Sequence, residues 1–500
     1  MAETRATILT GATAAAAWLT ERPAAYIAAF ALILMWPALL NAGPFYFGDS
    51  AGYLRGGEVA VQFVVDRLTP VGGTPAGHEA APPGEGVHGV RSIAYSVFAY
   101  LTRAPGDSWF LTSLLQAVAV ATTLWVLFRI HKMHRHPAAM ASLALLAAFL
   151  TPASWFSVFA MPDIWAGIAI LAIALLTASP RETPVPIRML FGGFIAFAVS
   201  AHLSHVPIIG LLVMLSGVVI LARSSLPAWR TAARDFAWIA LPALIGLVAN
   251  VTSNAIGFKE VSVTGKRYPI VLASSIQHGP ARWFLERNCA TERFAVCELY
   301  PGKLPRSSGE FLWGPDGVRA RATVDQIERI RAEEPEILRR AIAAYPFSSA
   351  TSAASISLRQ LVKIGLDDHH FEFRLARDPA GVVQQIETGE ERLGLKYAVE
   401  SVFLTTMFAA LGALVWLVRD RRSLLRPGDR TLLLMAVGGC LINAVVCGTL
   451  SAAADRYQGR VIWVAVLCVA VIGWRAWSER EPRARRASPR KEFETHVVEN

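Results

Sequence analysis

Long blocks of apolar residues alternate with short polar loops along most of the chain. Most blocks are about 18–24 residues long, which is the length that a helix needs to cross ~30 Å of hydrocarbon. Lipid offers the backbone no hydrogen-bond partner, so each block must satisfy its own N–H and C=O groups, as a helix does. The pattern predicts ten transmembrane helices, over residues 23–42, 108–130, 137–154, 156–178, 188–203, 206–222, 236–256, 398–418, 431–450 and 459–477.

Lys and Arg residues fall in alternate loops of this predicted bundle. They occur in the loops at 131–136, 181–188, 223–234 and 419–430 and in the tail after 475. The opposite short loops, near 155 and 204, contain neither Lys nor Arg, and the loop near 455 contains only two Arg. Basic loops stay on the cytoplasmic side, so both termini are expected in the cytoplasm, which an even number of spans allows.

Two long segments then lie outside the cytoplasm. We expect a transmembrane module at 1–256 with an external loop at 43–107, an external soluble domain at 257–396, further spans at 397–478 and a basic cytoplasmic tail at 479–500. Residues 6–19 are interpreted as an interfacial or disordered lead-in to an uncleaved first span, and Gly- and Pro-rich residues 71–87 as a flexible loop. The tail is predicted to be disordered and to contact anionic lipid headgroups. The predicted fold class is an all-α polytopic membrane protein with an α or α+β extracytoplasmic domain.

Local patterns within 257–396 support a folded domain. Residues 323–344 are amphipathic, and Pro346 ends the predicted helix. Cys289 and Cys297 are separated by seven residues, and outside the cytoplasm such a pair is predicted to form a disulfide. The alternative is two unpaired thiols. Cys440, Cys447 and Cys468 lie within predicted spans and are interpreted as small apolar residues.

Composition excludes several functional classes. Hydrophobic residues make up 54% of the chain and charged residues only 17%, which is too little charge for a set of soluble domains. The net charge of +10 does not indicate nucleic-acid binding, because the basic residues lie in loops that set membrane orientation. No P-loop, GxGxxG or GxSxG motif occurs in a convincing strand–turn–helix context.

Ionisable residues beside spans are costly, and by default they indicate a site that faces a cavity. On the predicted topology, all of the candidates share the external side. They are Asp49 after the first span, Arg91 in the first loop, Asp163 at the start of a span, His202 and His205 at a helix tip, and Asp455, Arg456, Tyr457 and Arg460 before the last span.

Each candidate has an ordinary structural alternative. Asp49 could cap a surface helix, and Asp163 could be the N-cap of its helix or lie in its first turn. His202 and His205 could be interfacial, and Asp455 with Arg456 could form an exposed loop pair. One shared site explains all of them together. A carboxylate there could accept a proton from an attacking hydroxyl, and arginines could neutralise a phosphate leaving group.

The order of these features resembles the GT-C superfamily of polytopic glycosyltransferases, in particular the protein mannosyltransferases and the lipid A aminoarabinose and galacturonic acid transferases. The first external loop carries Asp49 in Gly-Asp-Ser-Ala-Gly-Tyr-Leu. The similarity continues through the motifs at 92–95, 106–110, 162–167 and 456–457. It covers roughly residues 23–222 and 398–477.

The resemblance implies a sugar transfer from a polyprenyl-phosphate donor to an extracytoplasmic glycolipid or polysaccharide, at a bacterial-type inner membrane. Asp49 would be the general base that deprotonates the acceptor. Donor phosphate would be held by Arg456 and Arg460, with Arg91. The remaining substrate-binding residues would be Asp163, His202, His205, Tyr95 and Tyr457.

The chain also departs from this family. The usual acidic doublet of the first loop is Asp49-Ser50 here, and the Pro-Pro pair of the re-entrant stretch is missing. No metal ligand is assigned, and a divalent cation stays an open alternative. Residues 367–370 with Glu372 suggest a metal cluster, but adjacent His residues on an irregular segment are more often solvated. Two rival functions are a transporter or flippase and a non-catalytic envelope-assembly protein.

Overall fold

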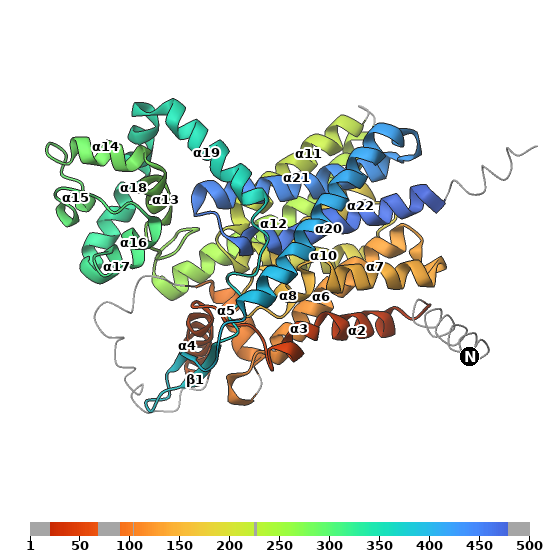
Figure 1. Ribbon diagram of the computed structural model, residues 1–500, viewed down its shortest axis with the longest axis horizontal. Helices are drawn as coiled ribbons and strands as arrows, with labels where there is room; N and C mark the ends of the chain where they lie inside the picture. Colours follow the sequence, from red (N-terminus) through yellow and green to blue (C-terminus); the bar gives the residue numbers. More distant parts are fainter. Residues whose placement is uncertain (1–20, 69–90, 104, 225–227, 479–500) are drawn as a thin grey trace, which may run out of the picture.

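The computed structural model describes residues 21–68, 91–103, 105–224 and 228–478. Within these ranges a bundle of long helices contacts a smaller group of short helices (Figure 1). The bundle consists of α2 (Pro23–Leu34), α3 (Trp36–Leu40), α6 (Phe110–Ile130), α7 (Pro137–Phe149), α8 (Ala153–Ser157), α9 (Ile164–Ala178), α10 (Val185–Ala201), α11 (His205–Arg223), α12 (Trp229–Phe258), α20 (Leu393–Asp420), α21 (Pro427–Leu450) and α22 (Asp455–Ser478). The expectations for 6–19, 71–87 and 479–500 concern segments outside the described residues.

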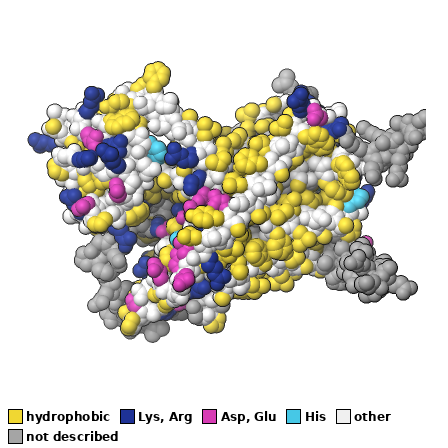
Figure 2. Space-filling model, viewed as in Figure 1, with side chains coloured by type: hydrophobic (Ala, Val, Ile, Leu, Met, Phe, Trp, Pro, Cys, Tyr) yellow, Lys and Arg dark blue, Asp and Glu magenta, His cyan; other side chains and the backbone are white. Residues whose placement is uncertain are grey.

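Seven helices in the described part of the chain are long and apolar enough to cross a membrane, counting 23–40 as one. Three further apolar helices, α7, α9 and α10, are shorter, with 13, 15 and 17 residues. Together they coincide with the ten predicted blocks. Hydrophobic side chains cover the face of the bundle, while charged groups gather on the short-helix domain and at its junction with the bundle (Figure 2). These features are those of an all-α multi-pass membrane protein, and the count of ten crossings stays a prediction.

Loops predicted to share a side of the membrane do contact one another. At one end of the bundle His131 lies 3.7 Å from Asp429, and Arg223 donates to the Thr431 hydroxyl at 2.9 Å. At the other end the guanidinium of Arg460 reaches both Asp163 and Ser204. These contacts agree with the alternating direction of the helices that the charge pattern predicts.

Helix α9 lies at the centre of the bundle, with all 15 of its residues buried. It packs against α6, α10, α11, α21 and α22. Gly167 permits the close approach of α22, because a Cβ atom there would lie 2.6 Å from the Arg460 carbonyl oxygen. Small residues commonly provide such close helix contacts in membranes.

The chain that leads into α9 is not a long helix. Residues 151–163 contain only the five-residue α8, and all of them are buried in protein. Backbone without regular helical hydrogen bonds is tolerated at membrane depth only where protein surrounds it. Phe45 provides hydrogen-bond partners for some backbone groups of this segment, because it pairs with Phe159 in a parallel β-bridge. The predicted spans at 137–154 and 156–178 are therefore shorter helices joined by buried irregular chain.

The short helices form a domain with a hydrophobic core of its own, which runs from Tyr268 to Tyr345 and which we call the helical domain. Its elements are α13 (Ile270–His278), α14 (Pro280–Asn288), α15 (Ala295–Leu299), α16 (Ser308–Trp313), α17 (Val318–Arg321) and α18 (Val324–Ala344). Thr323 and Gln326 form a capping box at the start of α18, so the amphipathic helix predicted at 323–344 is confirmed.

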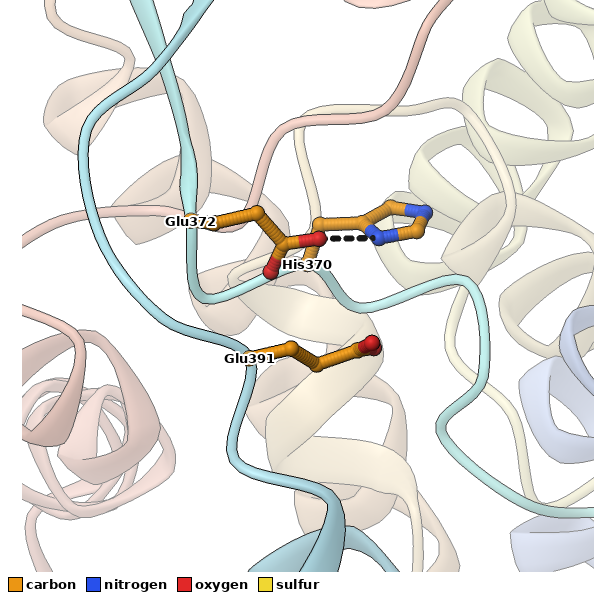
Figure 3. A group of neighbouring side chains, drawn as sticks. All are labelled: His370, Glu372 and Glu391. Carbon is orange, nitrogen blue, oxygen red and sulfur yellow. Dashed lines mark hydrogen bonds and ion pairs between the residues drawn. The ribbon is translucent and has the colours of Figure 1, made fainter.

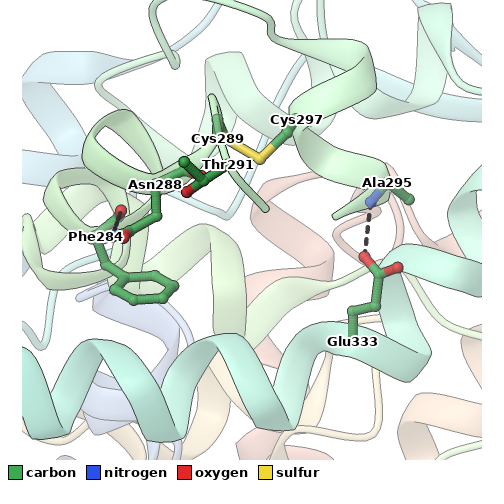
Figure 4. The surroundings of a disulfide bond; sticks show 7 residues. All are labelled: Phe284, Asn288, Cys289, Thr291, Ala295, Cys297 and Glu333. Atoms are coloured by element: carbon green, nitrogen blue, oxygen red, sulfur yellow. Dashed lines mark hydrogen bonds between the residues drawn. A yellow bond between two sulfur atoms is a disulfide. The ribbon is translucent and has the colours of Figure 1, made fainter. Parts of the chain in front are cut away.

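The predicted disulfide between Cys289 and Cys297 is present (Figure 4). It joins the end of α14 to α15, and the backbone N–H of Ala295 beside it donates to Glu333 of α18 at 2.8 Å. The disulfide and this hydrogen bond together fix α15 against the long helix α18. Cys440, Cys447 and Cys468 are buried free thiols, as predicted.

The predicted unit 257–396 is divided in the structure. After α19 (Pro346–Leu361) the chain forms an antiparallel hairpin of β1 (Phe373–Arg377) and β2 (Val383–Glu387). Ile364, Phe371 and Val383 belong to the core of the bundle and not to that of the helical domain. Residues 364–387 thus pack with the bundle and not with the helical domain.

The first loop contains more helix than its composition suggests. Helix α4 (Ser50–Leu68) begins directly after Asp49, and α5 (Ile93–Leu101) packs beside it. Gly57 allows this contact, because a Cβ atom there would lie 2.1 Å from the Ser96 carbonyl oxygen. The sequence did not predict α4.

Candidate functional site

Asp49 is positioned by a short extended segment that is attached to the buried chain before α9. Phe45 N–H donates to the Val158 carbonyl at 3.0 Å, and its own carbonyl accepts from Ala160 N–H at 2.8 Å. The Ser50 hydroxyl also donates to the Ala160 carbonyl at 3.0 Å. These bonds hold the residue before α4 against the centre of the bundle.

The Asp49 carboxylate forms an ion pair with Arg91 from the start of α5. Both side chains are partly accessible, with 25% and 29% of their surface exposed. Arg91 is placed by the helix that follows it, because Ser92 caps α5 by accepting from Tyr95 N–H at 3.3 Å. The pair is therefore a solvent-reachable carboxylate and guanidinium, on elements 42 positions apart in sequence.

Arg456 lies on the aromatic rings of Phe47 and Tyr457, at 4.5 and 4.9 Å from their centroids. Its Nη2 donates to the Tyr457 hydroxyl at 3.1 Å, while its Nη1 is buried and has no hydrogen-bond partner among the described residues. Among the described residues Arg456 forms no ion pair, although Asp49, Asp163 and Asp368 lie within electrostatic range. The ring contacts and the free N–H leave a cation that is suited to binding an anion.

Asp163 and Arg460 lie beneath this accessible layer. Their side chains are 1% and 0% exposed and are joined at 3.0 Å. Arg460 donates in addition to the following acceptors: Ser204 Oγ at 3.0 Å, Asn443 Oδ1 at 3.2 Å and Cys447 Sγ at 3.2 Å. Asp163 occupies the N-cap position of α9, as the structural alternative predicted, but its side chain makes no capping hydrogen bond and instead pairs with Arg460. In this conformation neither residue reaches a soluble substrate, and together they fix α9, α21 and α22 under the site.

The two histidines of the 202–205 turn occupy different environments. His202 Nδ1 lies 2.8 Å from Ser204 Oγ, and Arg91, Arg456 and Arg460 all lie within electrostatic range of it. His205 is fully buried, and its Nδ1 lies 2.8 Å from the Ala198 carbonyl oxygen. Of the two, only His202 is partly exposed at the accessible layer.

Two tyrosines complete the floor of the site. Tyr95 is fully buried and donates its hydroxyl to Gln116 at 3.0 Å, so in this structure it packs and does not face the site. Tyr53, which the sequence did not single out, packs edge-on against Tyr95 with ring centroids 5.0 Å apart. Asp49, Arg91, Asp163 and Arg456 all lie within electrostatic range of Tyr53. In the sequence, only its position one helical turn after Asp49 indicated that Tyr53 could lie near the site.

Asp455 and Arg456 do not form an exposed loop pair. Asp455 begins α22, is 4% exposed and lies 3.5 Å from the Lys363 ammonium. Asp455 therefore contacts Lys363, whereas Arg456 contacts aromatic rings. The alternative of an exposed loop pair between Asp455 and Arg456 is wrong.

The expectation of solvated histidines at 369–370 is also wrong for His369. Its ring is fully buried and stacks on Phe159 at 4.4 Å, with Phe45 and Phe156 around it. This burial lowers the pKa of His369 to about 3, because the charged imidazolium would lose its hydration there. His370 is only partly buried and belongs to a separate cluster.

The structure thus brings most of the predicted residues to one end of the bundle in two layers. Asp49, Arg91, His202 and Arg456 form the partly accessible layer, which we call the upper layer. The buried members are Tyr95, Asp163, His205, Tyr457 and Arg460. Comparison with protein-family models, with curated protein sequences and with solved structures finds no match to this chain.

Proposed function

We propose that this chain is a membrane glycosyltransferase that moves a sugar from a polyprenyl-phosphate donor to an extracytoplasmic glycolipid or polysaccharide acceptor. The observation that carries the proposal is the upper layer itself. An accessible carboxylate, Asp49, lies within electrostatic range of Arg456, a cation with an unpartnered N–H. A base and an anion-binding group are the two functions that transfer from a phosphate-linked sugar requires.

The reaction can be written on these residues. The acceptor hydroxyl oxygen attacks the anomeric carbon, the bond from that carbon to the phosphate oxygen breaks, and the hydroxyl proton passes to Asp49. The phosphate leaves on its lipid with an added negative charge, which Arg456 neutralises. One carboxylate suffices for this direct displacement, which inverts the anomeric centre.

The ion pair of Asp49 with Arg91 suggests how the base is made available. A carboxylate that is bound to a guanidinium has fewer lone pairs free to accept a proton. A donor phosphate competes for Arg91, since guanidinium groups bind phosphate as readily as carboxylate. Donor binding would then release Asp49 oxygen atoms for the acceptor, so the proposed mechanism predicts that donor binds before acceptor.

The test uses purified full-length protein in lipid nanodiscs with undecaprenyl-phosphate-linked mannose, glucose and arabinose. Donor binding is measured first, because it needs no acceptor, and transfer to lipid extracts of the source envelope is followed by mass spectrometry. Arg456→Gln is expected to weaken donor binding and to lower transfer about 100-fold. Asp49→Asn is expected to lower transfer by a similar factor while donor binding persists.

Asp66→Asn and Arg67→Gln are matched controls, because both residues lie on α4 and are exposed. Both controls should retain wild-type transfer. Full transfer by a folded Asp49→Asn protein would remove the proposal. Movement of the lipid-linked sugar across the membrane of proteoliposomes, without covalent transfer, would instead favour the transporter.

A further inference from the structure

A second group of chemically active side chains lies outside the upper layer. His370, Glu372 and Glu391 come together beside the hairpin (Figure 3). His370 Nδ1 and Glu372 Oε1 are 2.9 Å apart, and one ligand atom from each of the three residues lies within 4.8 Å of the others. Glu391 comes from the far side of the hairpin, just before α20, so its approach to His370 and Glu372 could not be predicted from local sequence.

The His370 ring is held in place before any ligand arrives. It is stacked 4.2 Å from Phe373 and 6.2 Å from Phe47, and its backbone pairs with Tyr46 in an antiparallel bridge. Glu372 is 14% exposed, and its Oε2 is buried with no hydrogen-bond partner among the described residues. A buried carboxylate oxygen without a donor is costly, and it indicates a partner that the protein chain does not provide.

Lys396 partly compensates the charge of the cluster. Its buried ammonium binds one oxygen of Glu391 and donates to the Asp367 carbonyl at 3.2 Å. Two carboxylates and one ammonium leave one net negative charge beside the His370 imidazole. The second oxygen of Glu391 stays available, and the hydrogen bond from Lys396 would hold this carboxylate in a fixed orientation.

We propose that His370, Glu372 and Glu391 bind a transition-metal dication of the Zn²⁺ type. One imidazole and two carboxylates suit Zn²⁺ better than Mg²⁺ or Ca²⁺, which prefer oxygen ligands and higher coordination numbers. Zinc distances of about 2.0–2.2 Å place ligand atoms about 3.3 Å apart, so the ligand atoms, now within 4.8 Å of one another, need to approach by at most about 1.5 Å. Glu391 can make this movement, because 35% of its side chain is exposed.

Before a metal ion can bind, one hydrogen atom of His370 must move. The Nδ1–H of His370 now donates to Glu372, and Nδ1 must give up this hydrogen to bind the metal. The neutral imidazole can carry the hydrogen on Nε2 instead, so no other group has to accept it. The ion would then join residues 370–372 to 391 and close the base of the hairpin against Phe47. This role does not depend on the transferase function.

The test is a zinc titration of the full-length protein in detergent after EDTA treatment, in competition with a chromophoric chelator. Wild type should bind one Zn²⁺ per chain, with excess Mg²⁺ unable to displace it, and Co²⁺ should give a d–d absorption band typical of N and O ligands. Glu372→Gln and Glu391→Gln should each weaken binding about 100-fold. Glu387→Gln and Glu390→Gln, on the same hairpin and its connection, should bind as wild type.

Glu391 is the exposed member, so its substitution tests the site even if a His370 variant fails to fold. Unchanged affinity in Glu391→Gln and Glu372→Gln, or a stoichiometry well below one, would overturn the proposal. Either result would mean that Lys396 is the only cation the cluster binds. Loss of transferase activity is not used as a readout, so failure here leaves the proposed function untouched.

Discussion

Substituting Asp163 with Asn should destabilise the bundle more than any surface change. The carboxylate is 1% exposed and lies 3.0 Å from a guanidinium that is completely buried. At that distance the attraction is about 5 kcal/mol for an effective dielectric constant of about 20. Removing one partner of such a pair typically costs ~3–5 kcal/mol, because the remaining charge stays buried without compensation. We expect a loss of about 3 kcal/mol, since Ser204 and Asn443 still accept from Arg460.

The assay is reversible unfolding in mixed micelles as SDS is added, followed by tryptophan fluorescence. A second variant that carries both Asp163→Leu and Arg460→Met should lose less than Asp163→Asn alone, because no buried charge is left. Asp325→Asn, which breaks an exposed pair with Arg329 in α18, should leave the unfolding midpoint unchanged. If the single and double variants lose the same free energy of unfolding, or neither loses any, the Asp163–Arg460 pair does not stabilise the bundle.

Three further outcomes are expected. Gly167→Ala should cost about 1–3 kcal/mol by overpacking α9 against α22, whereas Gly193→Ala, with nothing within 4 Å of its Cβ position, should be neutral in the same unfolding assay. The pKa of His369 is lower in the folded state than the ordinary value near 6.5. The buried neutral ring therefore contributes its full share to the free energy of unfolding above pH 6.5, and this contribution is lost as the pH falls. The loss should reach about 2 kcal/mol by pH 5, and His369→Gln should flatten this part of the stability–pH curve. Cys289→Ser should destabilise the helical domain by about 2.5 kcal/mol, the entropy of the short loop that Cys297 closes, as measured by hydrogen exchange.

Sequence patterns predicted those features that depend on local composition. Apolar block length predicted the positions of the bundle helices, and the basic loops predicted which helix ends lie together. The amphipathic period and capping residues predicted α18, and the Cys spacing predicted the disulfide. Each of these signals lies within about twenty consecutive residues, so no knowledge of distant contacts was needed.

Features that depend on distant contacts were not predictable in the same way. Helix α4 contains Gly56 and Gly57, which disfavour a helix, and contact with α5 compensates for them. His369 looks like a solvated residue until Phe45 and Phe159 are brought around it by the β-bridge. The hairpin lies beyond the helical domain in sequence, yet its apolar face belongs to the bundle.

The candidate site shows the same division. Sequence position gave the correct neighbourhood for Asp49, Arg91 and Arg456, because ionisable residues at one membrane face were expected to meet. It did not separate the accessible residues from those beneath them. Arg460 is one turn of helix after Arg456, and only the packing of α9 and α21 decides that it is buried.

The burial of α9 on all sides has a consequence for biosynthesis. The helix leaves the ribosome long before α21 and α22, and the whole of residues 179–426 is made in between. At about 5–20 residues per second this interval lasts on the order of 10–50 s, during which Asp163 has no Arg460 to neutralise it. The insertion machinery or a chaperone must therefore shelter α9 until the C-terminal helices arrive. A chain that stops after α20 would expose the centre of the bundle to lipid and to quality-control proteases.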